Sequence, residues 1–443
     1  FDADSVVRNI NAFIKQPFTY TDIHNRLKSI EKISKYKVRF HLNKPYGMFL
    51  HDLARINLYS DIYLDKFAWQ GKATGDNTKE PGKYGLGPYI LVEGYATGRA
   101  QTPIVKLKAN PYYYEKGMPY IENITIYTQL ETSQAVNMVL DSPDKLDISP
   151  IPFNKKTEAT LSKYAKLVTR ESTHNIAAYF NLIKKDGVLK NIEVRVALNK
   201  AINQGKLLNF VYKKEGKVAP TAASVNYPSI KLAVDKLKPY GKNLSKNEIA
   251  SLKMILNGLH LKVITQDRFM FLWKGIEYQL KQFGVSLNYQ ITTSEKDIYA
   301  YLLTNRDEPK DWDILTWGND DWYGNHPWNT FFAYRTSSKW SAINKDKTLQ
   351  EYIDKLFYYN NGSDKFNEFV KKIIYRVYKK AYMLFVPSPN IVLAVNKEVY
   401  YEPSKVAIMP LWKAKISKYH WSVRKGNYTK DRQLPMFPTK VVK

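Results

Sequence analysis

The second half of the chain alternates between strand-like and helix-like patterns of apolar residues. Residues 261–265, 285–291 and 312–315 read as three strands that are separated by apolar stripes at helical spacing. The first of these helices is expected to end at Gly284 and the second to begin at Ser294. Strands that alternate with helices predict a parallel sheet with right-handed crossovers. The sequence therefore predicts an α/β fold.

The rest of the chain gives shorter elements. Residues 5–13 predict a helix capped by Asp4 or Ser5, and residues 37–42 alternate like a half-buried strand. Further strands or extended segments are predicted at 84–92 (after a turn), 105–109, 121–127, 146–148, 175–181 and 391–395, and further helices at 48–58, 132–140, 191–202 and 366–377.

Two segments, 179–182 and 386–391, are predicted to cross between lobes, and two crossings make one lobe discontinuous, as in hinge-closing proteins. We expect lobe I at 1–181, lobe II at 182–387, and a return to lobe I with a C-terminal tail at 388–443. The natural chain is expected to begin earlier, because its first residues read as a helix start inside a fold and no signal peptide precedes them.

One segment, 315–328, concentrates aromatic and ionisable residues. It holds three Trp, a Tyr, a His and two Asp, and Gly and Pro interrupt it, so we expect neither a regular strand nor a helix there. It follows a predicted strand, and in open α/β sheets ligands bind just outside the carboxyl ends of strands. The segment therefore predicts a binding surface; the alternative is a packed loop whose Trp side chains cover the core.

The composition limits the classes of function. The chain has 443 residues, a formal net charge of +27 and no Cys, which excludes disulfides and thiolate metal sites. Its Lys residues are scattered and no nucleic-acid-binding module is found, so we expect a solvated basic surface and no nucleic-acid partner. No apolar run is long enough to span a bilayer. Hydrolase, phosphate-binding and zinc-protease motifs are absent, so an enzyme is not expected.

Five segments, taken in order, resemble the extracytoplasmic solute-binding proteins of peptide and nickel ABC importers (family 5). They are 1–7 (F-x-A-x-x-V), 84–89 (G-T-G-P-Y), 110–113 (N-x-x-Y/W), 179–181 with 194–203 (F-N … V-R-x-A-L-x-x-A-I-D), and the segment from Trp317 (W-x-x-D-Y-x-D-P-x-x-F). The resemblance implies a two-lobe periplasmic-binding-protein fold (type II, large cluster). It also implies an extra β-rich subdomain on lobe I and a ligand cleft between the lobes.

The same resemblance implies a partner and a location. A monomeric receptor in the periplasm would close over its ligand and deliver it to the membrane permease subunits of an ABC importer. No enzyme cofactor is implied; a metal would be the transported cargo. The missing N-terminal stretch normally contributes to the cleft, so residues of the site are expected to lie outside this chain.

The sequence Thr316-Trp317-Gly318 resembles the T-W-G of nickel-importing members. The resemblance implies that Trp317, with Trp322 or Tyr323, stacks on a nickel chelate such as one with histidine. It also implies that an arginine grips the carboxylate of the chelator, for which Arg55 lies near the family position but is shifted. A bidentate arginine–carboxylate contact suits that role, and Arg335 is the second arginine candidate.

Two histidines are candidate nickel ligands. His326 lies inside the aromatic segment and is ranked first, and His51 is ranked second. One imidazole would suffice if a chelator filled the other positions. The segment 334–340 carries no His, although nickel-binding members often place one there, and His326 could instead be a turn histidine beside Pro327.

The alternative ligand is a dipeptide or oligopeptide. In peptide-binding members an Asp pairs with the amino terminus of the peptide and an Arg with its carboxyl end. Asp320 or Asp321 could take the first role, because a carboxylate in a cleft gains from a charged partner.

Overall fold

The computed structural model describes residues 1–15, 21–67, 81–96, 101–292, 295–302, 311–319, 321, 323–406 and 409–423. The predicted Asp320 and Trp322 and the C-terminal tail from Arg424 lie outside these described residues.

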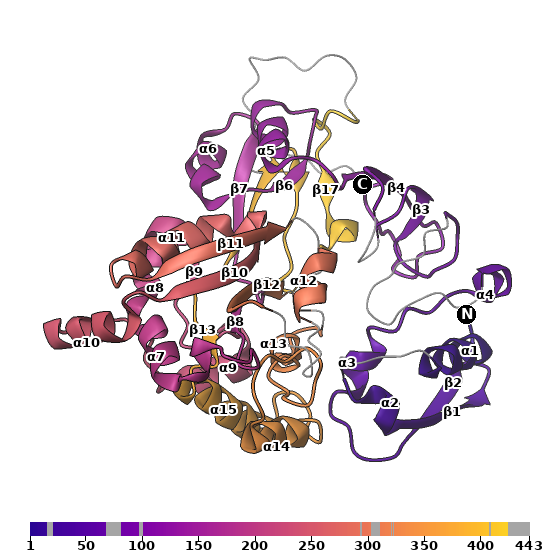
Figure 1. The fold of residues 1–443 in the computed structure, drawn as a ribbon. Helices are drawn as coiled ribbons and strands as arrows, with labels where there is room; N and C mark the ends of the chain where they lie inside the picture. Colours follow the sequence, from indigo (N-terminus) through magenta and orange to yellow (C-terminus); the bar gives the residue numbers. More distant parts are fainter. Residues whose placement is uncertain are drawn as a thin grey trace.

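A five-stranded sheet forms the centre of the larger lobe (Figure 1). Its order is β11-β10-β12-β8-β13, and β10 runs parallel to both β11 and β12. This confirms the predicted parallel arrangement, while β8 is antiparallel to β12 and β13. The strands are β8 (Asn175–Phe180), β10 (His260–Gln266), β11 (Ser286–Thr292), β12 (Ile314–Asn319) and β13 (Met383–Leu384).

The helices of this lobe lie around the sheet (Figure 1). In α15, every member of the apolar stripe predicted at 366–377 is buried, which fits the spacing of an amphipathic helix. The helices of this lobe are α7 (Ile192–Ala201), α8 (Gln204–Lys206), α9 (Pro228–Val234), α10 (Lys246–Leu256), α11 (Met270–Lys281), α12 (Glu295–Leu302), α13 (Trp328–Phe331), α14 (Lys347–Leu356) and α15 (Asp364–Lys379), with short turns η2 (Val188–Lys190), η3 (Leu207–Val211) and η4 (Asp267–Phe269).

A three-stranded sheet brings the C-terminal part back beside earlier elements. Strand β15 lies between β6 and β7 and is antiparallel to both. The chain therefore returns after the five-stranded sheet, although the proposed lobe boundaries stay a prediction. The elements here are α5 (Thr132–Asp141), β6 (Ile148–Pro150), η1 (Phe153–Lys155), α6 (Lys156–Leu161), β7 (Ala165–Arg170), β9 (Gly216–Lys217), β14 (Ser388–Pro389), β15 (Ile391–Asn396), β16 (Val399–Tyr400), η5 (Leu411–Lys413) and β17 (Lys415–Ile416).

The N-terminal part forms a separate group of elements at the right of Figure 1. Its first helix is capped by Asp2, whose side chain accepts hydrogen bonds from the backbone N–H groups of Asp4 and Ser5, so the predicted caps were wrong. The elements are α1 (Ala3–Ile14), α2 (Ile23–Arg26), β1 (Leu27–Ser34), β2 (Lys37–Leu42), α3 (Phe49–Leu53) and α4 (Asp61–Phe67), followed by the antiparallel sheet of β3 (Tyr89–Glu93), β4 (Ile104–Ala109) and β5 (Asn123–Tyr127).

The aromatic segment is more regular than its Gly and Pro content predicts. Residues up to Asn319 belong to β12, which pairs with β8, and Trp328 begins α13. Gly318 lies inside the strand, where a Cβ would lie 3.0 Å from the Phe269 ring, so a larger residue would require the ring to shift. The expectation of wholly irregular structure was wrong. Among the described residues of this segment, only the turn before α13 is irregular.

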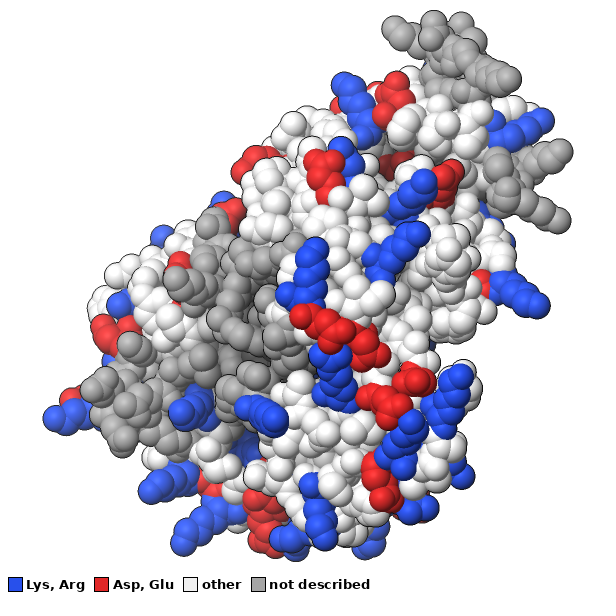
Figure 2. Space-filling view, turned by 90° about the vertical axis from the view of Figure 1, so that its right-hand side faces the viewer, with Lys and Arg blue, Asp and Glu red and all other residues white. Residues whose placement is uncertain are grey.

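Among the described residues, no helix is long and apolar enough to cross a membrane. Figure 2 shows Lys and Arg interspersed with Asp and Glu over the face that it presents. On this face, the basic side chains do not gather into one patch of the kind that binds nucleic acid.

Candidate functional site

Two predicted histidines from distant parts of the chain meet where α3 lies beside the aromatic segment (Figure 1). The ring centroids of His51 and His326 are 4.9 Å apart, edge to face. The Nδ1 atom of His51 lies 2.6 Å from the carbonyl oxygen of Tyr323. The guanidinium of Arg55 lies over the Tyr323 ring, 4.8 Å from its centroid, in a cation–π contact. These four predicted site residues therefore form one cluster.

The hydrogen-bond partners give the two rings opposite tautomers. The Nδ1 atom of His326 accepts from the backbone N–H of Trp328 at 3.1 Å, so the proton of the neutral ring is on Nε2. The Nδ1 atom of His51 faces a carbonyl oxygen, which can only accept, so Nδ1 carries the proton and Nε2 presents a lone pair.

Burial keeps His326 uncharged. Its side chain is fully buried, and desolvation, with His51 beside it, holds its pKa well below the ordinary value. Its Nε2 atom has no hydrogen-bond partner within the part of the chain that the structure describes.

The two tautomers differ in whether their ring can coordinate a metal. A metal-bound histidine almost always donates its other ring N–H to a carbonyl or carboxylate, as His51 does to Tyr323. The lone pair of His326 is already used by the backbone. The geometry thus favours His51 over His326, the reverse of the order that the sequence suggested, and both metal roles stay predictions.

A buried carboxyl group lies next to this cluster. Asp52 is 2% exposed and accepts hydrogen bonds from the hydroxyls of Thr21, at 2.9 Å, and Tyr46. Burial raises the pKa of Asp52 to about 7, while these hydrogen bonds and Arg55 lower it. This network fixes the turn that carries His51 and Arg55. Sequence reasoning missed it, and the signal was an acidic residue among the largely apolar residues of the helix predicted at 48–58.

The raised pKa of Asp52 predicts a pH-dependent stability. Between pH 3.8 and about 7 the folded protein holds a proton on Asp52 that the unfolded chain has lost, so stability falls as the pH rises through this window. Asp52→Asn should remove this dependence. Urea unfolding at pH 5 and pH 8 should show the parent losing about 2 kcal/mol more than the variant. Equal losses in both proteins would mean that Asp52 is ionised throughout.

Asp321 serves the loop itself. Its carboxylate accepts from the backbone N–H groups of Tyr323 (3.1 Å) and Asn325 (2.7 Å) and from the hydroxyl of Thr173 (3.0 Å). It is 1% exposed, and burial raises its pKa. This is a turn in which an Asp side chain binds the backbone that follows it. In this arrangement, the carboxylate is enclosed rather than presented to a peptide.

Two other predicted residues are also engaged within the protein. Trp317 is 2% exposed and stacks on Trp340 with ring centroids 6.0 Å apart. Arg335 forms ion pairs with Asp22, at 3.3 Å, and Asp354, at 3.1 Å. The structure does not bring either residue to the histidine cluster, and their ligand roles stay predictions.

The described residues contain no group of three or more His, Asp or Glu side chains that could hold a metal ion by themselves. A nickel ion at His51 would therefore need further ligands from a bound chelator.

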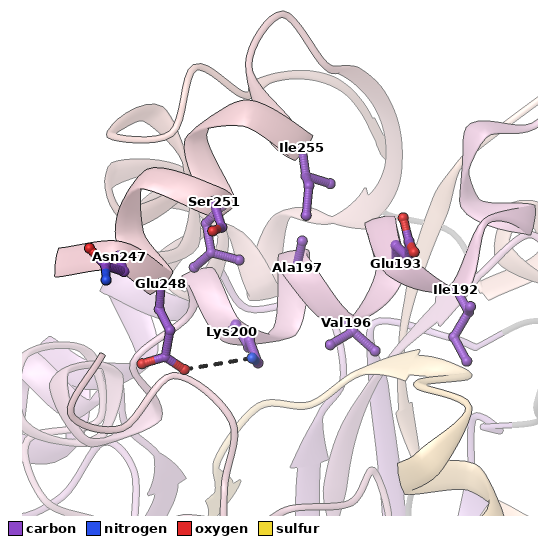
Figure 3. A pocket seen from close by; sticks show the side chains of 10 residues that line it. Ile192, Glu193, Val196, Ala197, Lys200, Asn247, Glu248, Ser251 and Ile255 are labelled. Atoms are coloured by element: carbon purple, nitrogen blue, oxygen red, sulfur yellow. Dashed lines mark ion pairs between the residues drawn. The ribbon is translucent and has the colours of Figure 1, made fainter. Parts of the chain in front are cut away.

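A separate cavity of about 600 Å³ lies between α7 and α10 (Figure 3). The close-up shows Val196, Ala197 and Ile255 along it, with the ion pair of Lys200 and Glu248 (3.7 Å) at one end. In Figure 1, α10 projects from the left edge while α3 lies at the right, so this cavity is remote from the histidine cluster.

The family of bacterial extracellular solute-binding proteins described as "family 5 Middle" matches residues 1–342. The peptide transport periplasmic protein SapA of Haemophilus influenzae is 25% identical over 327 residues, covering 69% of this chain and 54% of SapA. The glutathione-binding protein GsiB of Escherichia coli is 28% identical over 247 residues, covering 54% of this chain and 44% of GsiB. The chain thus spans about half the length of these relatives.

Solved structures share the fold. The periplasmic binding protein DppA from Helicobacter pylori, in complex with the peptide STSA, has a TM-score of 0.76 at 17% identity and covers 94% of this chain and 82% of its own. NikZ from Campylobacter jejuni, in complex with Ni(L-His), has a TM-score of 0.71 at 18% identity and covers 93% and 82%. These likenesses confirm the predicted two-lobe fold class, and the match over residues 1–342 shows that the chain belongs to family 5 of the bacterial extracellular solute-binding proteins, the peptide and nickel ABC-importer type.

Proposed function

We propose that this chain is the substrate-binding component of an ABC importer that captures nickel in the periplasm as a chelate with a small molecule such as histidine. The observation that carries the proposal is the cluster of His51, Arg55 and Tyr323. The chelate would bind between the N-terminal part and the aromatic segment. Contacts that exist only when the lobes are closed would shift the population toward the form that docks on the permease.

Each residue of the cluster has a chemical role in this proposal. The Nε2 lone pair of His51 is the nickel ligand, and the Tyr323 carbonyl orients the ring through Nδ1. The guanidinium of Arg55, held over Tyr323, pairs with the carboxylate of the chelator. The chelator fills the other coordination positions.

A peptide is the second candidate ligand, and the names of the relatives favour it. SapA is named for peptide transport and GsiB for glutathione, which is itself a tripeptide. A peptide carboxylate could also pair with the guanidinium of Arg55. A peptide ligand, however, gives no role to the Nε2 lone pair of His51. The enclosed carboxylate of Asp321 offers little to a peptide amino terminus, which leaves Asp320 for that role as a prediction.

Tryptophan fluorescence and calorimetry on the full-length protein separate the two candidates. The titrants are Ni(II) alone, histidine alone, both together, a pool of short peptides, and glutathione. The proposal expects a saturable response only when nickel and histidine are present together. A response to peptides or glutathione without one to the chelate would make this the receptor of a peptide importer.

A further inference from the structure

A second contact joins the N-terminal part to the larger lobe, next to the histidine cluster: the Tyr46 ring contacts Phe357, and its hydroxyl bonds Asp52, the residue after His51. On one side lie Asp22, Arg26 and the turn at Gly47; on the other lie Arg335 and the end of α14 with the turn that follows it. We call this contact the seam. It contains none of the four residues of the histidine cluster.

A row of alternating charges runs along the seam, and its Asp22–Arg335 pair crosses it. Arg26 pairs with Asp22 at 3.4 Å, Asp22 with Arg335 at 3.3 Å, and Arg335 with Asp354 at 3.1 Å. The side chains of Asp22 and Arg335 are only 14% and 21% exposed, so their attraction is less screened than that of a surface pair. The guanidinium of Arg335 also lies 5.1 Å from the centroid of the Phe357 ring. Arg26, over the Tyr358 ring at 4.7 Å, completes the row.

The backbones also approach closely at the seam. The N–H of Gly47 donates to the carbonyl oxygen of Phe357 at 2.7 Å. A Cβ on Gly47 would lie 2.0 Å from the carbonyl oxygen of Tyr359, a backbone atom that no rotamer change can move. Only glycine therefore permits the seam to close at this point.

We propose that the seam is a latch that sets the equilibrium between the open and closed lobes independently of which ligand is bound. Its contacts are all between protein groups, so they favour closure whether or not cargo is present. Because the apparent affinity is the intrinsic affinity scaled by the fraction of competent protein, weakening the latch lowers affinity for every ligand alike. The latch rests on the lobe closure of the proposed function, but its charged row can be tested without any ligand.

The absence of Cys makes the closure directly measurable, because two introduced cysteines can be labelled selectively. Tyr36→Cys and Tyr278→Cys place fluorophores on positions that are 75% and 73% exposed, on the two sides of the seam. Asp22→Asn and Arg335→Gln should each shift the distance distribution of the ligand-free protein toward the open form and weaken the binding of nickel–histidine about tenfold.

Glu351→Gln is the matched control. It breaks the exposed ion pair with Lys355, 2.7 Å long, on α14 itself and not across the seam. This variant should leave the distance distribution and affinity unchanged. If Arg335→Gln gave the same distance distribution as Glu351→Gln, the latch would be refuted.

Gly47→Ala distinguishes a closing contact from a permanent one. A latch predicts a protein that melts near the parent temperature but stays open, since the open form has room for the methyl group. A melting temperature many degrees lower with no gain in the open form would show that the seam is part of a fixed core, and would overturn the proposal.

The outcomes for latch and ligand separate cleanly. If Arg335→Gln opens the lobes but the protein does not bind nickel–histidine, the latch is supported and the proposed cargo is refuted. If Arg335→Gln and the parent bind nickel–histidine with equal affinity and show the same lobe distances, the cargo is supported and the latch is refuted.

Discussion

Replacing Trp317 by Ala is expected to lower the free energy of unfolding by about 3–5 kcal/mol, the range for truncating a buried Trp. The side chain is 2% exposed, stacks on Trp340 and meets the edges of Tyr299 and Phe332. Its removal would leave a cavity that these rings cannot fill without moving. Urea unfolding followed by circular dichroism measures the loss.

Trp421→Ala is the matched control, because Trp421 is 43% exposed. It should cost about 1 kcal/mol or less, as surface substitutions do. A Trp317→Ala protein with parental stability and lost ligand response would instead place Trp317 in the ligand surface, as the resemblance to nickel-importing members implied. A combined loss would show that packing and binding share this residue.

His51→Ala is expected to weaken binding of nickel–histidine by about 100-fold or more, since losing even an outer partner of a metal ligand costs about 10–100-fold. The variant removes the only lone pair in the cluster that is oriented by a carbonyl partner. Stability should change little, because His51 is only partly buried. Calorimetry with nickel and histidine together measures the affinity.

His41→Ala is the control for general loss of an imidazole from the N-terminal part, because its ring pairs with Glu31 at 3.0 Å on the exposed face of the first hairpin. It should bind like the parent. The relative effect of His326→Asn also decides between the two histidines. A larger loss of affinity in His326→Asn than in His51→Ala, at equal stability, would contradict the tautomer argument.

The larger lobe could be predicted from the sequence because its pattern is local. Strands β10 and β11 alternate with an amphipathic helix, and both their positions and their parallel pairing were predicted. The aromatic segment was misjudged because Gly318 reads as a breaker in sequence but lies inside β12, paired with Ile176 of β8. Tertiary packing, which no local pattern contains, decided that case.

The sequence could suggest candidate residues for a site but not how they are arranged, and their ligand roles stay predictions. His51 and Tyr323 are 272 positions apart, so nothing in the sequence indicated that they touch. The order of the two histidines was reversed by a single backbone hydrogen bond to His326, which depends on the turn after Pro327. The ion pair of Arg335 with Asp22 could not be predicted either, because the two residues lie far apart in the chain.

A crystal of the full-length protein grown with nickel and histidine, measured at the nickel absorption edge, tests the nickel site most directly. Nickel bound by His51 predicts one anomalous peak about 2 Å from Nε2 of His51, a usual metal–imidazole distance, with the chelator carboxylate against Arg55. A peak bound to His326 or elsewhere, or peptide density in the cleft without a peak, would contradict it.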